Sequence, residues 1–187
     1  MSNLSIFVRQ VRSRSLEHQR AMELLAYAEL AGQMVSVLRQ ELDSLVRVIY
    51  LLAQDEDRRE VLIQASVEGD KWIRSGSRAR VTDREMVDLA QQLQGWTQSV
   101  YKFGCAFIHL SFLHDYNDRD PLLLLPPDER RDIIQHCRFY HGGPQNDDAG
   151  FEELKCFLPR VLSKVSGNLE CYLELLEEGG TIEVNEI

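Results

Sequence analysis

Apolar residues in this chain recur at intervals of three and four, and this spacing constrains the fold more than any other feature. Such intervals place side chains on one face of an α-helix, whereas a half-buried strand would alternate every two residues. One stripe comprises Val35, Leu38, Leu42, Leu45, Ile49 and Leu52. Because strand patterns are nearly absent, the sequence predicts an all-α protein.

The same spacing and the helix-end signals predict where the helices lie. We expect helices at 16–53, 55–69, 82 to about 110, 128–141 and 151–178. Thr82 and Glu85 form a capping-box pattern at the start of the third helix. Pro159 interrupts or restarts the last one. The prediction is therefore a single domain, an antiparallel bundle of four to five helices.

The core of this domain is expected at about 16–178, with an arm at 1–15 and a tail at 179–187 outside it. The stripes of different helices should meet in the interior. We expect the interior to contain Leu42, Leu45, Leu93, Phe107, Val165 and Leu169.

The formal net charge of −9 argues against a broad, nonspecific grip on nucleic acid, since phosphate contacts carry most of that affinity. Positive charge nevertheless gathers in three stretches, 9–20, 71–84 and 129–143. No apolar run is as long as the roughly 18 residues of a membrane span. No signal-peptide pattern is present either, so we expect a cytoplasmic protein with reduced cysteines and no membrane partner.

The stretch ERRDIIQHCRFYHGG (129–143) combines an arginine and two histidines within a short predicted helix. On an ideal helix, Ile133, Ile134, Cys137 and Tyr140 share one face with His141. Arg131 lies on the opposite face and His136 at the border. One copy of the helix therefore does not bring Arg131 and His136 together.

The segment RDIIQH (131–136) resembles the Arg-x(4–6)-His motif of HEPN domains, in which Asn, Asp or His usually follows the arginine. Here that residue is Asp132. The helical architecture of 16–178 is also similar to that family. The resemblance implies a homodimer with its motif helix near the two-fold axis. It further implies a metal-independent endoribonuclease of a toxin–antitoxin or defence system, with a cognate protein partner, or an inactive helical binder.

Under this resemblance, Arg131 would stabilise charge on the scissile phosphate and His136 would transfer protons in RNA cleavage. These roles suit the arginine fork and the histidine pKa. A second alignment ends the motif at His141–Gly142 and makes His141 the candidate histidine. Asp132 is a supporting candidate in the first alignment.

Two further residues are candidates for supporting roles. His114 should point inward near the end of the third helix, as a core or capping residue or as a partner of the motif helix. Glu41 flanks the apolar stripe of the first helix. It should form a salt bridge at the rim or orient a basic residue of the motif helix.

The sequence leaves two other functions open. A noncatalytic helical interaction or regulatory module fits the acidic charge and the long amphipathic helices. A metal-dependent hydrolase is the weaker alternative, since only Cys105 and His109 have a spacing suited to shared ligation. No nucleotide-binding or zinc-protease motif is present, so no cofactor is expected.

Overall fold

The computed structural model describes residues 2–184, and this part of the chain contains helices and no strand, which confirms the all-α prediction. The helices are α1 (Asn3–Tyr27), α2 (Ala31–Leu52), α3 (Glu56–Glu68), α4 (Asp83–Gln94), α5 (Thr97–Ile108), α6 (Pro127–His141), α7 (Phe151–Lys155) and α8 (Leu158–Glu177), with a 3₁₀ turn at Phe112–Asp115. None of these helices is long and apolar enough to cross a membrane.

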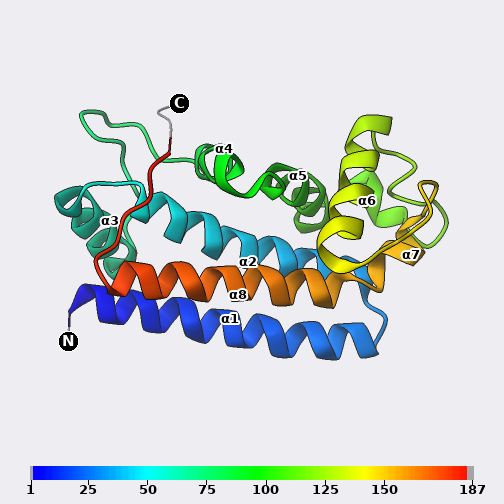
Figure 1. The fold of residues 1–187 in the computed structure, drawn as a ribbon, viewed down its shortest axis with the longest axis horizontal. Coiled ribbons are helices and arrows are strands. Elements are labelled where there is room, and N and C mark those ends of the chain that lie inside the picture. Colours follow the sequence, from blue (N-terminus) through cyan, green and yellow to red (C-terminus); the bar gives the residue numbers. More distant parts are fainter. Residues whose placement is uncertain (1, 185–187) are drawn as a thin grey trace.

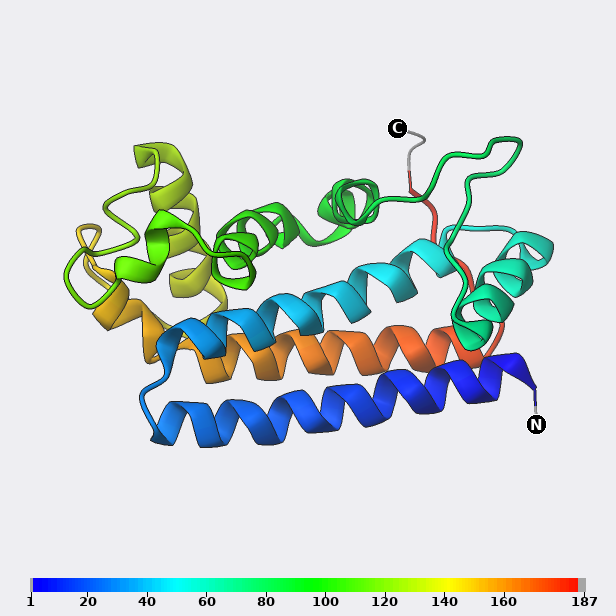
Figure 2. The same ribbon diagram turned by 180° about the vertical axis from the view of Figure 1, so that it is seen from behind.

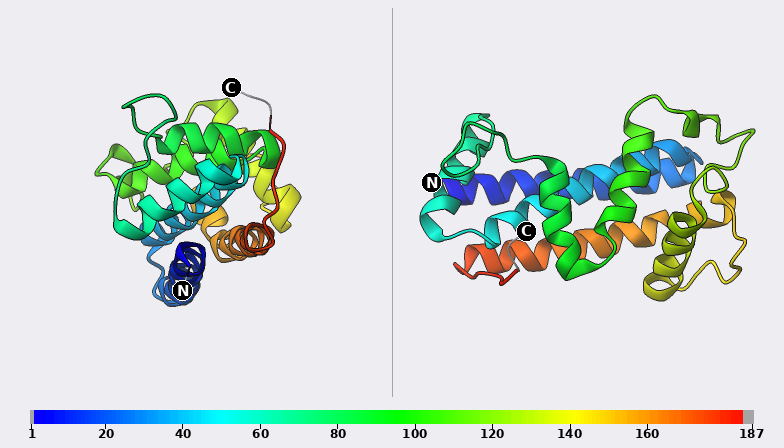
Figure 3. Two further views of the ribbon diagram at one scale, coloured as in Figure 1. Left: turned by 90° about the vertical axis from the view of Figure 1, so that its left-hand side faces the viewer. Right: turned by 90° about the horizontal axis from the view of Figure 1, so that it is seen from above.

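Helix α2 lies at the centre of the bundle. Helix α1 runs antiparallel to it, and α8 lies along both of them (Figure 1). Helices α4 and α5 cover the side of α2 that faces away from α1, as the end-on view in Figure 3 shows. Because α2 has neighbours on all sides, it is buried around most of its circumference, which explains its continuous apolar run at 48–52.

The expected first helix at 16–53 is in fact two helices, and the expected arm at 1–15 belongs to the first of them from Asn3 onward. The chain reverses at residues 28–30, where Glu29 adopts a left-handed conformation with φ of 56°. This conformation usually requires glycine and costs another residue about 1–2 kcal/mol. Residues 28–30 include no glycine or proline, so no local sequence signal marks a reversal here. The prediction of one helix was wrong.

The expected helix from 82 to about 110 is also two helices. Helix α4 begins at the predicted Thr82–Glu85 capping box and ends at Gly95, whose φ of 72° is left-handed. Helix α5 then begins at Thr97, which donates a hydrogen bond to the carbonyl of Val87. Gly95 is a common type of helix stop, and the uninterrupted apolar spacing across it concealed the break.

The remaining helix predictions agree with the structure. Asp55 caps α3, and Gly69 ends it. Helix α6 ends at Gly142, and the segment after Phe151 restarts at Leu158, next to Pro159. Of the expected tail, residues 185–187 lie outside the described residues. Ile182 donates a backbone hydrogen bond to Leu52.

The predicted interior is largely confirmed. Leu42, Leu45, Phe107, Val165 and Leu169 are buried. Leu93 is 39% exposed, so its assignment to the core was wrong. The break at Gly95 changes the direction of the chain after α4, and Leu93 is left at the edge of a cavity.

Candidate functional site

Helix α6 carries the predicted motif, and its ends are fixed by local signals. Pro127 occupies the first turn together with Asp128 and Glu129, as the helix dipole prefers. At the other end, Gly142 is left-handed, with φ of 82°. Arg138 donates from Nε to the carbonyl of Pro144 at 2.9 Å, which holds the following loop against the helix.

One face of α6 forms a wall of a cavity of about 400 Å³, here called the apolar pocket. Ile133, Cys137, Tyr140 and His141 line it, which confirms the face predicted from the helical wheel. Helices α2, α4, α5, α7 and α8 supply the other walls. The walls are mostly apolar and include Val35, Leu38, Leu93, Trp96, Val100, Phe103, Leu158, Val161 and Val165.

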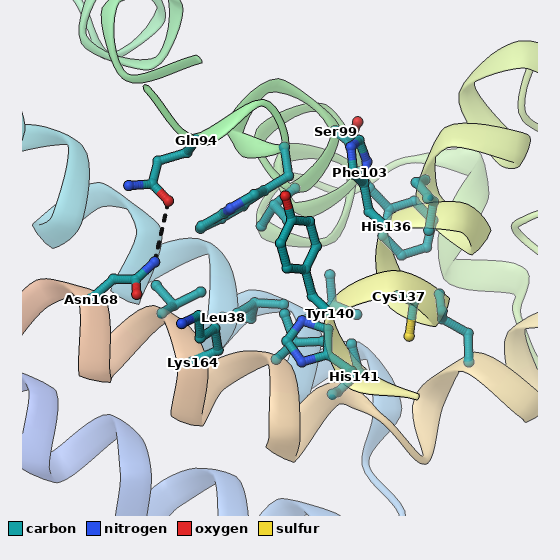
Figure 4. A pocket seen from close by; sticks show the side chains of 18 of the residues that line it. Leu38, Gln94, Ser99, Phe103, His136, Cys137, Tyr140, His141, Lys164 and Asn168 are labelled. Carbon is teal, nitrogen blue, oxygen red and sulfur yellow. Dashed lines mark hydrogen bonds between the residues drawn. The ribbon is translucent and has the colours of Figure 1, made fainter. Parts of the chain in front are cut away.

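A few polar groups interrupt these apolar walls (Figure 4). Asn168 donates to Gln94 at 3.2 Å and closes one side. Lys164 belongs to α8, and His141 at the end of α6 lies near it, whereas His136 lies beside Ser99 of α5. The pocket thus has the composition of a small-molecule site, with apolar walls and a small number of converging polar groups.

The α8 side of the apolar pocket is positively charged. Burial lowers the pKa of His141, and the nearby cations Lys164 and Arg160 lower it further. His141 is therefore neutral at pH 7 and can accept a hydrogen bond there. Lys164 forms no ion pair with any carboxylate of the described residues, so its charge is available to a ligand. Burial raises the pKa of Cys137 to about 11, so this thiol is protonated and not a nucleophile at neutral pH.

The structure does not bring Arg131 and His136 together within one chain. The Arg131 side chain is 62% exposed and pairs with Asp128 of the same helix at 3.3 Å. It borders a hollow on the outer side of α6 together with Gln135 and Asp148. His136, which the helical wheel placed at the border of the apolar face, lines the apolar pocket.

His136 and His141 are both at the apolar pocket, so the structure brings these two candidates into one site. His136 Nδ1 is buried and has no hydrogen-bond partner among the described residues. His136 also borders a second, outward-facing hollow with Asp132, Gln135 and Phe139. Asp132 is exposed there and lies one turn before His136.

Glu41 is neither at a rim nor beside α6, so both expectations for it were wrong. Its carboxylate is fully buried between α1, α2 and α8. It accepts hydrogen bonds from Ser15 at 2.5 Å, from His18 Nδ1 at 2.6 Å and from Ser166 at 2.7 Å. These four residues, here called the Glu41 cluster, bind the three longest helices together.

His114 has the capping role that was one of its two predicted alternatives. It lies in the 3₁₀ turn, and its Nδ1 accepts a hydrogen bond from the backbone of Ser111 at 3.2 Å. Its ring packs against Phe107, with 5.7 Å between centroids. It does not line the apolar pocket.

Cys105 and His109 belong to the end of α5, where Cys105 is partly buried and His109 is exposed. Within residues 2–184, no group of three or more histidine, cysteine or acidic side chains is arranged to hold a metal ion. Cys137 is buried, as its place on the apolar face of α6 indicated.

Sequence reasoning missed Lys164 and Asn168, which supply much of the polarity of the apolar pocket. Both lie on α8, each directly before a residue that was predicted to be in the core, Val165 or Leu169. Polar residues at the edge of a stripe are ordinary rim positions, so only the placement of α4 and α6 above them reveals a site. His18 was missed for a similar reason, because it lies in a segment rich in charged residues.

Comparisons with known proteins identify no relative of this chain. No family model, no curated protein and no solved structure matches the chain.

Proposed function

We propose that the protein binds a small, mostly apolar molecule that carries an acidic group, and that the apolar pocket is its binding site. The observation that carries the proposal is a cavity of about 400 Å³ with apolar walls and an unpaired lysine. Ligand cavities typically measure about 300–1,000 Å³ and combine apolar walls with a few polar groups.

The polar groups favour an acid over other head groups. Lys164 offers a positive charge without an internal carboxylate partner, and the pKa of His141 is lowered partly by that same charge. A ligand carboxylate would add negative charge where positive charge is now unbalanced. The apolar body of the ligand would lie against side chains such as Val100 and Val161, from which it would displace water.

Binding of this kind suits the noncatalytic, regulatory module that the sequence left open. The pocket walls come from six helices, which span the sequence from α2 to α8. A ligand that fills the pocket would stabilise their arrangement, because a molecule that binds only the folded state raises its stability.

Trp96 lines the apolar pocket and provides the test. Decanoate and decanol are titrated against the full chain while tryptophan emission is followed. Decanoate should bind more tightly, and Lys164→Ala should reduce that preference about fivefold, as expected for a partly exposed ion pair of about 1 kcal/mol. Lys102→Ala is the matched control, since Lys102 is an exposed lysine of α5 outside the pocket. Equal affinity for acid and alcohol would contradict the proposal.

A specific feature of α6 favours a second candidate, the homodimeric, metal-independent endoribonuclease. The outer face of α6 carries Phe139, which is 81% exposed and lines the hollow of His136, and Gln135 lines both this hollow and that of Arg131. A second copy packed on this face would cover Phe139 and place the Arg131 of one chain near the His136 of the other. An isologous interface of this type needs only one self-complementary patch.

This second candidate is tested by sedimentation at tens of micromolar and by RNA cleavage in the presence of a chelator. A dimer that cleaves RNA supports it, with losses of about 10²–10⁴-fold for His136→Ala, the range of general acid–base catalysis. Arg131→Ala should cause a similar loss. If His141→Ala abolishes cleavage and His136→Ala does not, the motif ends at His141. A monomer without cleavage rejects this candidate and leaves the ligand-binding proposal intact.

A further inference from the structure

A second cavity lies at the other end of the bundle from α6. It measures about 490 Å³ and is lined by α1, α2, α3 and the loop of residues 70–81. Figure 2 shows this loop rising beside α3, close to the end of α2. The side chains around this cavity include Arg14, Arg47, Lys71 and Arg80, so we call it the basic pocket.

The basic pocket joins two of the three positive stretches of the sequence. Arg14 comes from the stretch at 9–20, whereas Lys71 and Arg80 come from the stretch at 71–84. Arg47 belongs to α2, between them in the sequence. The chain thus gathers four cations around one cavity although its formal net charge is −9. Asp70 is the acidic residue in the lining.

Two of the four cations are held in place by carboxylates behind the pocket. Asp43 accepts from Arg47 at 3.1 Å and pairs with Arg14 at 3.4 Å. Arg47 also pairs with Asp83 at 3.2 Å, and its guanidinium lies 5.4 Å from the Trp72 ring centroid. These contacts fix the guanidinium groups in orientation and leave N–H donors for a further acceptor, since each guanidinium carries five.

The other two cations, Lys71 and Arg80, have no carboxylate partner within residues 2–184. Both are exposed and lie near the two ends of the same loop, whose ends are joined by hydrogen bonds between Trp72 and Val81 and between Arg74 and Ala79. The positive charge of the pocket is therefore only partly neutralised from within the protein.

We propose that the basic pocket binds the phosphate or diphosphate group of a small soluble molecule. Arginine forks bind phosphate oxygens with paired, charge-assisted hydrogen bonds, and lysine adds a mobile point charge. The Ser44 hydroxyl accepts from Arg14 Nη1 at 3.3 Å and donates to the carbonyl of Gln40, so it helps to hold the Arg14 guanidinium at this wall. The acidic remainder of the chain favours a compact anion over a long polyanion, which the other surfaces would repel.

The experiment uses the full chain and inorganic pyrophosphate as the probe, with calorimetry at constant ionic strength. Lys71→Ala and Arg80→Ala should each weaken binding about tenfold or more, the effect of losing one hydrogen bond between charged groups. Arg78→Ala is the matched control, because Arg78 is an exposed cation of the same loop that does not line the pocket. It should leave the affinity unchanged.

Several results would overturn the proposal. One is the absence of pyrophosphate binding at millimolar concentration, and another is an equal loss in all three variants, which would indicate unspecific attraction to the loop. A third is binding of a single-stranded RNA oligomer by a protein that does not bind pyrophosphate. All three substitutions are at exposed positions, where effects on folding stability are usually within about 0.5 kcal/mol, and urea unfolding verifies this.

Discussion

At the residue scale, Glu41 is the group on which the packing of the longest helices depends. Its carboxylate is buried, and its acceptor capacity is used by Ser15, His18 and Ser166. Removing one partner of such a buried cluster leaves the others without compensation, which typically costs about 3–5 kcal/mol. We expect Glu41→Ala to lower the free energy of unfolding in urea by this amount. Glu23→Ala, at an exposed position of α1, should change it by less than about 0.5 kcal/mol.

The same carboxylate predicts how stability depends on pH. Burial alone would raise the pKa of Glu41, but the hydrogen bonds from His18, Ser15 and Ser166 outweigh burial and hold the pKa below the ordinary value of 4.5. The folded state thus retains fewer protons than the unfolded state near that pH. Its contribution to stability is present above about pH 4.5 and is lost as the pH falls through the lowered pKa. Unfolding curves between pH 7 and 3 should show a smaller loss for Glu41→Gln than for the native chain.

At the element scale, α2 and α5 approach closely at Gly104. A Cβ atom added there would lie 2.6 Å from the Cβ of Arg39. This Cβ belongs to the start of a buried side chain whose guanidinium lies over Tyr101, so the neighbour has little room to move. We expect Gly104→Ala to destabilise the protein by about 1–3 kcal/mol through overpacking.

Gly167 provides the matched control for this element. It lies within α8, it is exposed, and an added Cβ atom would meet no other atom within 4 Å. Gly167→Ala should therefore raise stability by about 0.5–1 kcal/mol, because alanine is the better helix former. A thermal or urea unfolding experiment that gives both variants the same sign would contradict the close approach of α2 and α5.

At the scale of the whole molecule, Phe107 connects elements that are far apart in the sequence. Its ring packs against Phe103, Tyr116 and Phe151, with centroid distances of 5.2, 6.0 and 5.8 Å. Phe107→Ala should cost about 3–5 kcal/mol, since a large buried side chain would leave a cavity. Leu93→Ala, at a partly exposed position, should cost less than about 1 kcal/mol. Urea unfolding of the two variants measures the difference, and similar losses would contradict the observed placement of Leu93.

The sequence by itself determined most of the helical segments and where several of them end, although it missed the helical residues before position 16. The three-and-four spacing, the Thr82–Glu85 capping box and the stop at Gly142 act within one or two helical turns. Such local interactions follow from neighbouring residues alone. For the same reason, the face of α6 that lines the apolar pocket could be predicted from the helical wheel.

Only the tertiary structure decided the left-handed turn at Glu29, the burial of Glu41 and the assembly of both pockets. Glu29 carries no local signal for its conformation, and packing of α1 against α2 maintains it. Glu41 is stabilised by Ser166, which is 125 residues away in the sequence. The basic pocket likewise requires Arg14 and Arg80 to meet across the bundle. These contacts depend on how whole helices pack, and packing is set by shape and burial over the entire core and not by the spacing of residues within one segment.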